Sequence, residues 1–185
     1  MIRSFVGLPI PDETIRSFTR LQHGLSTARP VPEENLHLTL AYLDDQPESL
    51  LRELAEILDT IPPAPFEIRL KGVKLMGGKA PGALAVEADG GDPLVRLQSS
   101  VVRAARDVGI ELERRKFRPH VTIFRFSRTA EATDSERIQA WITEYGQFPP
   151  FSFVAESLTL YRSTLGPGGA VYDVLEDFPF TGLGY

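Results

Sequence analysis

NLHLTLAYL, residues 35–43, is matched later in the chain by RPHVTIFRF, residues 118–126. Each stretch carries a histidine and a threonine two positions apart, set among apolar residues. Successive side chains of a β-strand point to opposite faces, so this alternation is typical of a strand with one buried face. We therefore expect two strands, each with its histidine and threonine together on the polar face.

The segments around the two stretches match as well. In both halves of the chain, a strand and an amphipathic helix precede the stretch, and a second amphipathic helix and a further strand follow it. Apolar residues recur with the 3.6-residue period of a helix at residues 15–25, 50–58, 94–108 and 138–145. The additional strands are expected at residues 2–8, 66–73, 83–88 and 151–161.

This order of elements predicts the α+β class, with residues 1–185 forming a single domain. Residues 1–73 and 82–161 are interpreted as an internal repeat, and residues 158–180 as an added C-terminal hairpin. Two such halves are expected to form two pseudo-symmetric lobes with a central cleft between them. Each lobe is expected to be an antiparallel-rich sheet covered by helices on its outer face.

Three loops are marked by glycine and proline. Residues 62–65 are expected to link the two halves, and residues 166–169 to form the turn of the C-terminal hairpin. Residues 76–82 are long and glycine-rich, so we expect a flexible lip over a site there.

The composition narrows the class of protein. Hydrophobic residues make up 42% of the chain and charged residues 24%, which are globular averages and exclude disorder or a coiled coil. The absence of cysteine excludes a disulfide framework, a zinc ribbon, an iron–sulfur cluster and a thiol nucleophile, and favours a reducing, cytoplasmic location. No apolar run of about 18 residues and no signal peptide are present, so no membrane association is expected.

The charge is unevenly distributed. A net charge of −5 argues against a protein that coats nucleic acid non-specifically. Residues 114–128, however, carry six arginines and lysines and no acid, which leaves −11 for the rest of the chain. This basic stretch surrounds His120, so we expect it to attract an anionic substrate.

Two histidines and two threonines would meet in the cleft if the matched strands lie together: His37, Thr39, His120 and Thr122. One neutral imidazole can accept a proton from an attacking hydroxyl while a protonated imidazole donates one to a leaving oxygen, and their usual pKa of about 6.5 suits both tasks. The hydroxyls can bind the non-bridging oxygens of a phosphate. This set points to phosphoryl chemistry without a metal or other cofactor, although a three-histidine metal site that includes His23 stays open.

Two arginines flank the second motif. Arg118 and Arg125 are candidates for contacts with the substrate. Arg125 lies three residues after Thr122, so in a regular strand it would point away from the polar face. Its contact with a phosphate therefore requires a bulge or a strand end.

With these motifs the chain resembles the 2H phosphoesterase superfamily, whose mark is a pair of His-x-Thr or His-x-Ser motifs in duplicated lobes. The matching segments are ENLHLTL at residues 34–40 and FRPHVTI at residues 117–123. The C-terminal segments LYRS at residues 160–163 and GPGGAVY at residues 166–172 resemble those of the bacterial RNA 2′,3′-cyclic phosphodiesterases, also known as 2′-5′ RNA ligases or LigT-like proteins. The resemblance extends from the first expected strand to the last.

The resemblance implies an activity and a set of roles. The reaction would be hydrolysis of an RNA-terminal 2′,3′-cyclic phosphate to a 2′-phosphate, with reversible 2′-5′ RNA ligation beside it. His37 would be the proton donor to the leaving oxygen and His120 the proton acceptor from water, with Thr39 and Thr122 on the phosphate. The partner would be an RNA or oligonucleotide end, bound by a monomer. From the residues alone the near-symmetry of the motifs leaves the acid and base assignment open.

One departure from the family concerns base stacking. Family members often carry an aromatic residue in the strand after the central loop, where this chain has ALAV at residues 83–86. Phe5, Phe124 and Tyr161 are candidate substitutes, and each also suits a core position. Two other functions stay open: a nucleotide- or RNA-binding module with little catalysis, and a cyclic phosphodiesterase that acts on small nucleotides.

Overall fold

The structure, a computed structural model, describes residues 1–61, 63–77, 81–126, 132–167 and 169–182. The middle of the expected lip, residues 78–80, and Arg128 of the basic stretch lie outside the described residues. Across the described ranges, no helix combines the length and the apolar composition needed to span a membrane.

The described residues form nine strands, four α-helices and one 3-10 turn. The strands are β1 (Ile2–Pro9), β2 (Arg29–Pro30), β3 (His37–Gln46), β4 (Phe66–Gly77), β5 (Pro81–Asp89), β6 (His120–Arg125), β7 (Phe151–Ala155), β8 (Ser157–Gly166) and β9 (Gly169–Pro179). The helices are α1 (Asp12–Leu21), α2 (Glu48–Leu58), α3 (Gly91–Asp107) and α4 (Ala132–Tyr145), with the 3-10 turn η1 (Glu33–Asn35) before β3. The expected α+β class is confirmed.

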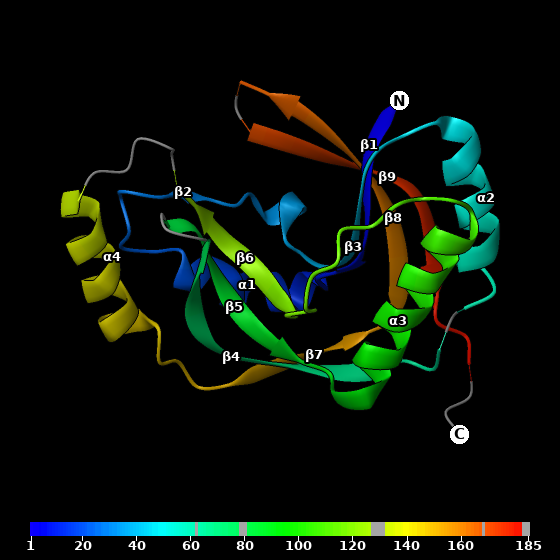
Figure 1. Cartoon of the computed structure of the whole chain (residues 1–185). Helices are drawn as coiled ribbons and strands as arrows, with labels where there is room; N and C mark the ends of the chain where they lie inside the picture. The colour runs from blue at the N-terminus through cyan, green and yellow to red at the C-terminus, as the bar shows by residue number, and fades with distance from the viewer. Residues whose placement is uncertain (62, 78–80, 127–131, 168, 183–185) are drawn as a thin grey trace.

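All strands belong to one antiparallel sheet, in the order β7-β4-β5-β6-β3-β1-β8-β9, with β2 beside β6. The sheet has two arms that meet where β3 lies next to β6. We call β3, β1, β8 and β9 the first lobe, and β6, β5, β4 and β7 the second lobe. Figure 1 shows the sheet curling, with helices on its outside. The predicted two-lobed architecture is therefore present.

The lobes do not coincide with the two halves of the sequence. Helix α3, from the second half, packs on β3 and α2 of the first lobe. Helix α1, from the first half, contacts the second lobe, where Phe18 lies edge-on against Phe151 of β7. Strand β4 pairs with β5, although they come from different halves. Each lobe is thus built from both halves, because local periodicity predicts a helix or strand but not the partner on which it packs.

The strand expected at residues 151–161 is two strands that belong to different lobes. Strand β7 pairs with β4 and ends at Ala155, whereas β8 begins at Ser157 and pairs with β1. Only Glu156 separates them, so the outer parts of the two lobes come close at this corner. There the backbone N–H of Phe180 donates to the carbonyl of Glu156 over 2.7 Å. The C-terminal hairpin is confirmed, with β8 and β9 paired along their length.

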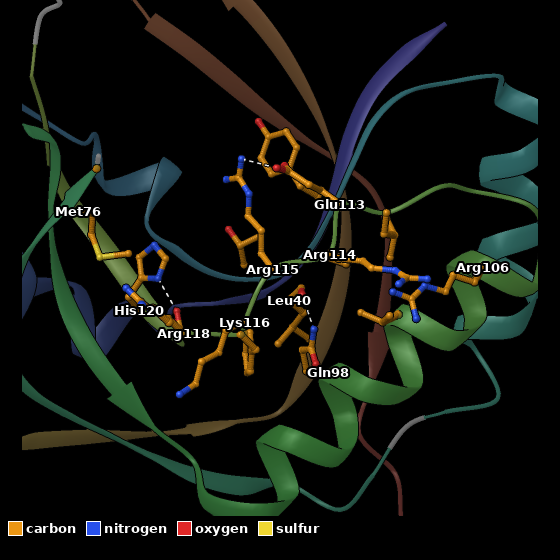
Figure 2. A pocket seen from close by; sticks show the side chains of 17 residues that line it. Leu40, Met76, Gln98, Arg106, Glu113, Arg114, Arg115, Lys116, Arg118 and His120 are labelled. Atoms are coloured by element: carbon orange, nitrogen blue, oxygen red, sulfur yellow. Dashed lines mark hydrogen bonds and ion pairs between the residues drawn. The ribbon is translucent and has the colours of Figure 1, made fainter. Parts of the chain in front are cut away.

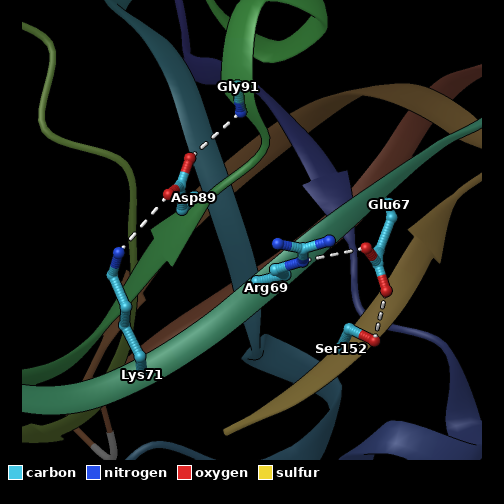
Figure 3. Close-up of polar contacts among 6 residues, drawn as sticks. All are labelled: Glu67, Arg69, Lys71, Asp89, Gly91 and Ser152. Atoms are coloured by element: carbon cyan, nitrogen blue, oxygen red, sulfur yellow. Dashed lines mark hydrogen bonds and ion pairs between the residues drawn. The ribbon is translucent and has the colours of Figure 1, made fainter.

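Helix ends differ from the expected positions in two places. Helix α1 ends at Leu21, and Leu25, expected on its apolar face, is buried beyond a turn in which Gly24 takes a φ of 85°. Helix α3 begins at Gly91, before the apolar period expected at residues 94–108, and its N-cap residue, Gly90, makes no side-chain hydrogen bond. Instead, the Asp89 carboxylate accepts from the Gly91 N–H over 3.1 Å, as Figure 3 shows.

This contact gives a prediction for stability. The hydrogen bond from the Gly91 N–H, and to a smaller extent the Lys71 ammonium, hold the pKa of Asp89 below its usual value. The contribution of the Asp89 carboxylate to the free energy of unfolding is therefore complete at neutral pH and disappears as the pH falls through that pKa. Replacing Asp89→Ala should lower the free energy of unfolding by about 1 kcal/mol at pH 7, and by less at pH 3. Urea unfolding at both pH values measures it, and Asp92→Ala, also at the start of α3, is the control. Equal losses at the two pH values would contradict this account.

Candidate active site

Strands β3 and β6 bring the two motifs together. Leu38 and Val121, both fully buried, are register partners in this antiparallel pair. Because the strands run in opposite directions, the residues on either side of these partners face one another: His37 is directed towards Thr122, and Thr39 towards His120. All of these histidines and threonines are half-buried. The expected grouping of the motifs on one polar face is therefore present.

The two imidazoles are held in the same way. Nδ1 of His37 lies 2.7 Å from the carbonyl oxygen of Asn35, and Nδ1 of His120 lies 2.6 Å from that of Arg118. A carbonyl only accepts, so Nδ1 carries the proton in both rings, and Nε2 is the unprotonated nitrogen of each neutral ring. The hydroxyl of Thr39 donates to Nε2 of His37 over 2.9 Å. In both rings Nε2 is thus the nitrogen that can accept a proton, and in His37 it is hydrogen-bonded to Thr39.

Burial affects His37 strongly. It lowers the pKa of His37 to about 4, and the positive charge of Arg125 acts in the same direction. The bond to the Asn35 carbonyl opposes this but is weaker. In the free protein at neutral pH, His37 is therefore a neutral imidazole.

An aromatic cluster causes this burial. The ring of Phe5 lies 4.6 Å from that of His37, and Tyr172 meets His37 edge-on at 5.1 Å. Tyr161 stacks on Phe5 at 4.8 Å. Phe5 is only 1% exposed and Tyr161 only 8%, so the structure places these candidate substrate contacts behind His37, with no ring face open for stacking. Phe124 is fully buried beside Trp141.

A β-bulge follows each motif. In β3, Thr39 pairs with Gly7 and Ala41 with Val6, which leaves Leu40 as an extra residue. In β6, Ile123 is extra in the same way, between the partners of Ala85 and Leu84. An extra residue reverses the alternation of faces, so residues three positions after each threonine return to the polar face.

The residues returned by the bulges are Tyr42 and Arg125. Tyr42 is 44% exposed and lines the cleft, and its ring stacks over Phe5 at 5.9 Å. Arg125 is exposed, and its charge acts on both His37 and Tyr172. The bulge that a phosphate contact of Arg125 requires is therefore present. In the sequence, each bulge is marked by two adjacent apolar residues after the threonine. Tyr42, which lines the cleft, was missed by the sequence analysis.

A cleft of about 1050 Å³ opens beside the motifs. Thr39 and His120 line it, as does Arg118, together with the cleft face of α3 and the segment between α3 and β6. Figure 2 shows basic side chains along it: Arg106, Arg114, Arg115, Lys116 and Arg118. One acid, Glu113, lines it too and pairs with Arg115 over 2.8 Å. The expected basic surface around His120 is thus part of a cleft, and α3 adds Arg106, which the sequence analysis missed.

The structure separates His23 from the other two histidines. His23 is exposed in the turn after α1, and its carbonyl accepts from Trp141 Nε1 of α4 over 2.8 Å. Within the described residues, no group of three His, Asp or Glu side chains is placed to hold a metal ion.

A curled two-lobed sheet with paired His-x-Thr strands defines a recognised class of protein. The model of the 2'-5' RNA ligase superfamily matches residues 10–167, and the chain belongs to this family. An RNA 2',3'-cyclic phosphodiesterase of Thermotoga maritima is 28% identical over 98% of this chain and 97% of its own length. One from Geobacillus stearothermophilus is 27% identical over 96% of this chain, which spans 57% of that longer protein.

Solved structures agree on the fold. The protein TT0787 of Thermus thermophilus superposes with a TM-score of 0.80 at 25% identity, covering 98% of this chain and 99% of that one. E. coli LigT complexed with 3'-AMP superposes with a TM-score of 0.76 at 22% identity, covering 97% and 98% of the two chains.

The burial of His37 gives a prediction for titration. Its ring should titrate near pH 4 and remain protonated on Nδ1 above that pH. Because the unfolded chain binds this proton more readily, His37 lowers stability as the pH drops from about 6.5 towards 4. Arg125→Gln removes a neighbouring positive charge and should raise the pKa of His37, whereas Arg103→Gln on α3 should not. Nitrogen-15 NMR titration of the imidazoles measures this, and a midpoint above pH 6 in the unaltered protein would contradict it.

Proposed function

We propose that this chain is an RNA 2′,3′-cyclic phosphodiesterase that hydrolyses a terminal 2′,3′-cyclic phosphate to a 2′-phosphate. The observation that carries the proposal is the matched pair of imidazoles, His37 and His120, each of which holds Nδ1 on a backbone carbonyl. His120 lines the basic cleft, and Nε2 of His37 meets the hydroxyl of Thr39, which lines the same cleft. The names of relatives that match nearly the whole chain support the substrate class.

The reaction requires that one proton be removed from the attacking water and that another be donated to the leaving 3′ oxygen. Water attacks phosphorus on the side opposite the 3′ oxygen, a new P–O bond forms, and the bond from phosphorus to the 3′ oxygen breaks, which leaves the phosphate on the 2′ oxygen. Nε2 of His120 accepts the proton of water, and Nε2–H of His37 donates to the 3′ oxygen. Thr39 and Thr122 bind the non-bridging oxygens, where negative charge gathers in the transition state. The same groups form a 2′-5′ linkage when the 5′ hydroxyl of a second RNA end attacks phosphorus in place of water, and the reverse of that step cleaves the linkage.

The donor role of His37 requires that it gain a proton. Its pKa of about 4 in the free protein leaves it neutral at pH 7, and the negative charge of a bound phosphate favours the imidazolium form. One proton shared between two imidazoles gives the same bell-shaped pH profile whichever ring holds it, so a pH profile does not distinguish the two assignments. The assignment of roles follows the resemblance to the family and is tested separately below.

Arg125 and Tyr42 complete the proposed site. The positively charged guanidinium of Arg125 lies near His37 on the polar face, where it can bind a phosphate oxygen. Tyr42 is an exposed aromatic residue of the cleft, in a position to contact the terminal base in place of the aromatic residue missing at residues 83–86. Phe5 stacks against its ring and the Arg3 guanidinium lies over the ring at 5.7 Å, so stacking of a base requires Arg3 to move aside. Arg118 lines the cleft beside His120 and is assigned to the RNA backbone.

Replacing either histidine tests the catalytic roles. His37→Ala and His120→Ala should each lower kcat by about 10²- to 10⁴-fold while binding of a 2′-phosphate product persists. His23→Ala, a histidine outside the cleft, is the matched control and should keep full activity. Unchanged turnover in both active-site variants would overturn the roles of the two histidines, and no turnover in the unaltered protein would favour a binding module instead.

A sulfur leaving group separates the donor from the acceptor. A cyclic substrate with sulfur in place of the 3′ oxygen expels a thiolate, which needs no proton. It should therefore restore activity to His37→Ala but not to His120→Ala. Restoration of the His120 variant alone would reverse the two roles.

Metal independence has its own test. Activity should persist in EDTA. Loss of activity that is restored by added metal would show that the protein is a metallohydrolase.

Phosphorus NMR of the product should place the phosphate on the 2′ oxygen. The proposal includes action as a monomer in the cytoplasm, which light scattering and cell fractionation test.

A further inference from the structure

The cleft continues past the motifs along helix α3. Gln98, Val102 and Arg106 line it at intervals of four residues, so they form one stripe of the helix about 12 Å long. The stripe begins at the catalytic strand, because the side-chain amide of Gln98 donates to the carbonyl of Leu40, the bulge residue after Thr39, over 3.4 Å. It therefore leads from the reaction site to Arg106.

The opposite wall of this part of the cleft is the segment that leads from α3 to β6. It supplies Leu112 and Arg114, and Figure 2 shows Arg114 and Arg106 at the α3 end of the cleft. We call Gln98, Val102, Arg106, Leu112 and Arg114 the α3 arm.

The cations of the α3 arm lack acidic partners. Arg115 pairs with Glu113, and Arg96 on the far face of α3 pairs with Asp92. By contrast, no carboxylate of the described residues lies within 4.0 Å of the Arg106 or Arg114 guanidinium. Two exposed cations that share one cleft repel each other, and an anion between or beside them offsets that repulsion.

The size of the cleft shows what kind of anion fits. Its volume of about 1050 Å³ is at the upper end for a pocket that holds one small molecule, so a terminal nucleotide leaves part of it free. Val102 and Leu112, which are half-buried, add an apolar surface between the motifs and the two arginines. A chain that alternates phosphates with ribose and base matches such a surface better than a free phosphate does.

We propose that the α3 arm binds the RNA chain on the 5′ side of the terminal nucleotide, with Arg106 and Arg114 on its phosphodiesters. This inference rests on the proposed function and adds a substrate preference to it: oligonucleotides ending in a cyclic phosphate are better substrates than mononucleoside cyclic phosphates. The arm acts on binding, so it affects KM and not the chemical step.

Two matched substrates test the arm. Arg106→Gln and Arg114→Gln should each lower kcat/KM for an oligoribonucleotide 2′,3′-cyclic phosphate about tenfold, through KM, as expected for one charge-assisted hydrogen bond. Turnover of a mononucleoside 2′,3′-cyclic phosphate should stay unchanged. The control is Arg103→Gln, which removes an exposed cation of α3 outside the cleft. Each arm variant should also reduce the slope of log kcat/KM against log salt by about 0.7.

A neutral linkage locates the contact. Oligonucleotides in which one of the last phosphodiesters is a methylphosphonate should lose affinity in the unaltered protein, and the loss should disappear in Arg106→Gln or Arg114→Gln. Fluorescence anisotropy with a 3′-phosphorylated oligonucleotide measures this binding without turnover.

The outcomes separate the two proposals. Equal losses of kcat/KM for both substrates would assign the arginines to the reaction itself. No loss for either substrate would show that the α3 arm does not bind RNA. Either result overturns the proposed role of the α3 arm. An unaltered protein that turns over neither substrate overturns the proposed function, while the anisotropy series still decides whether the arm binds RNA.

Discussion

The meeting of β3 with β6 is the constraint on which the rest of the molecule depends. The two strands share one register pair, Leu38 with Val121, at the point where the two lobes join. That single contact is enough to place the histidine of each motif across from the threonine of the other. Longer pairing would close the sheet over this point, whereas the short contact lets the lobes diverge and leaves room for a cleft. The corner at Glu156, where β7 gives way to β8, connects the two lobes a second time.

The two motifs are alike in sequence but differ in surroundings. Phe5, Tyr161 and Tyr172 surround His37, and they remove enough water to hold its pKa near 4. His120 instead lies in the wall of a basic cleft. The two rings are thus unequal in the free protein, where His37 is neutral at pH 7, and its proposed role as donor depends on the negative charge of a bound phosphate.

The exchange of helices between the halves also shapes the site. Because α3 packs on β3 and not beside β5, which precedes it in the chain, its polar stripe becomes a wall of the cleft next to Thr39. The basic segment that follows α3 must then pass along the cleft to reach β6. The arrangement places Arg106 and Arg114 on facing walls at one end of the cleft, with His120 away from them along the cleft.

Sequence alone predicted most of the elements and the proposed chemistry. Period-2 alternation predicted β3 and β6, and two matched His-x-Thr motifs predicted imidazoles and hydroxyls on one face, because side-chain direction in a strand is a local property. The basic stretch around His120 was visible for the same reason. Only the tertiary structure decided which helix packs on which lobe, where the expected strand divides at Glu156, that Phe5 lies behind His37, and that bulges turn Tyr42 and Arg125 to the polar face. Those features depend on contacts between residues far apart in the chain, which no local periodicity encodes.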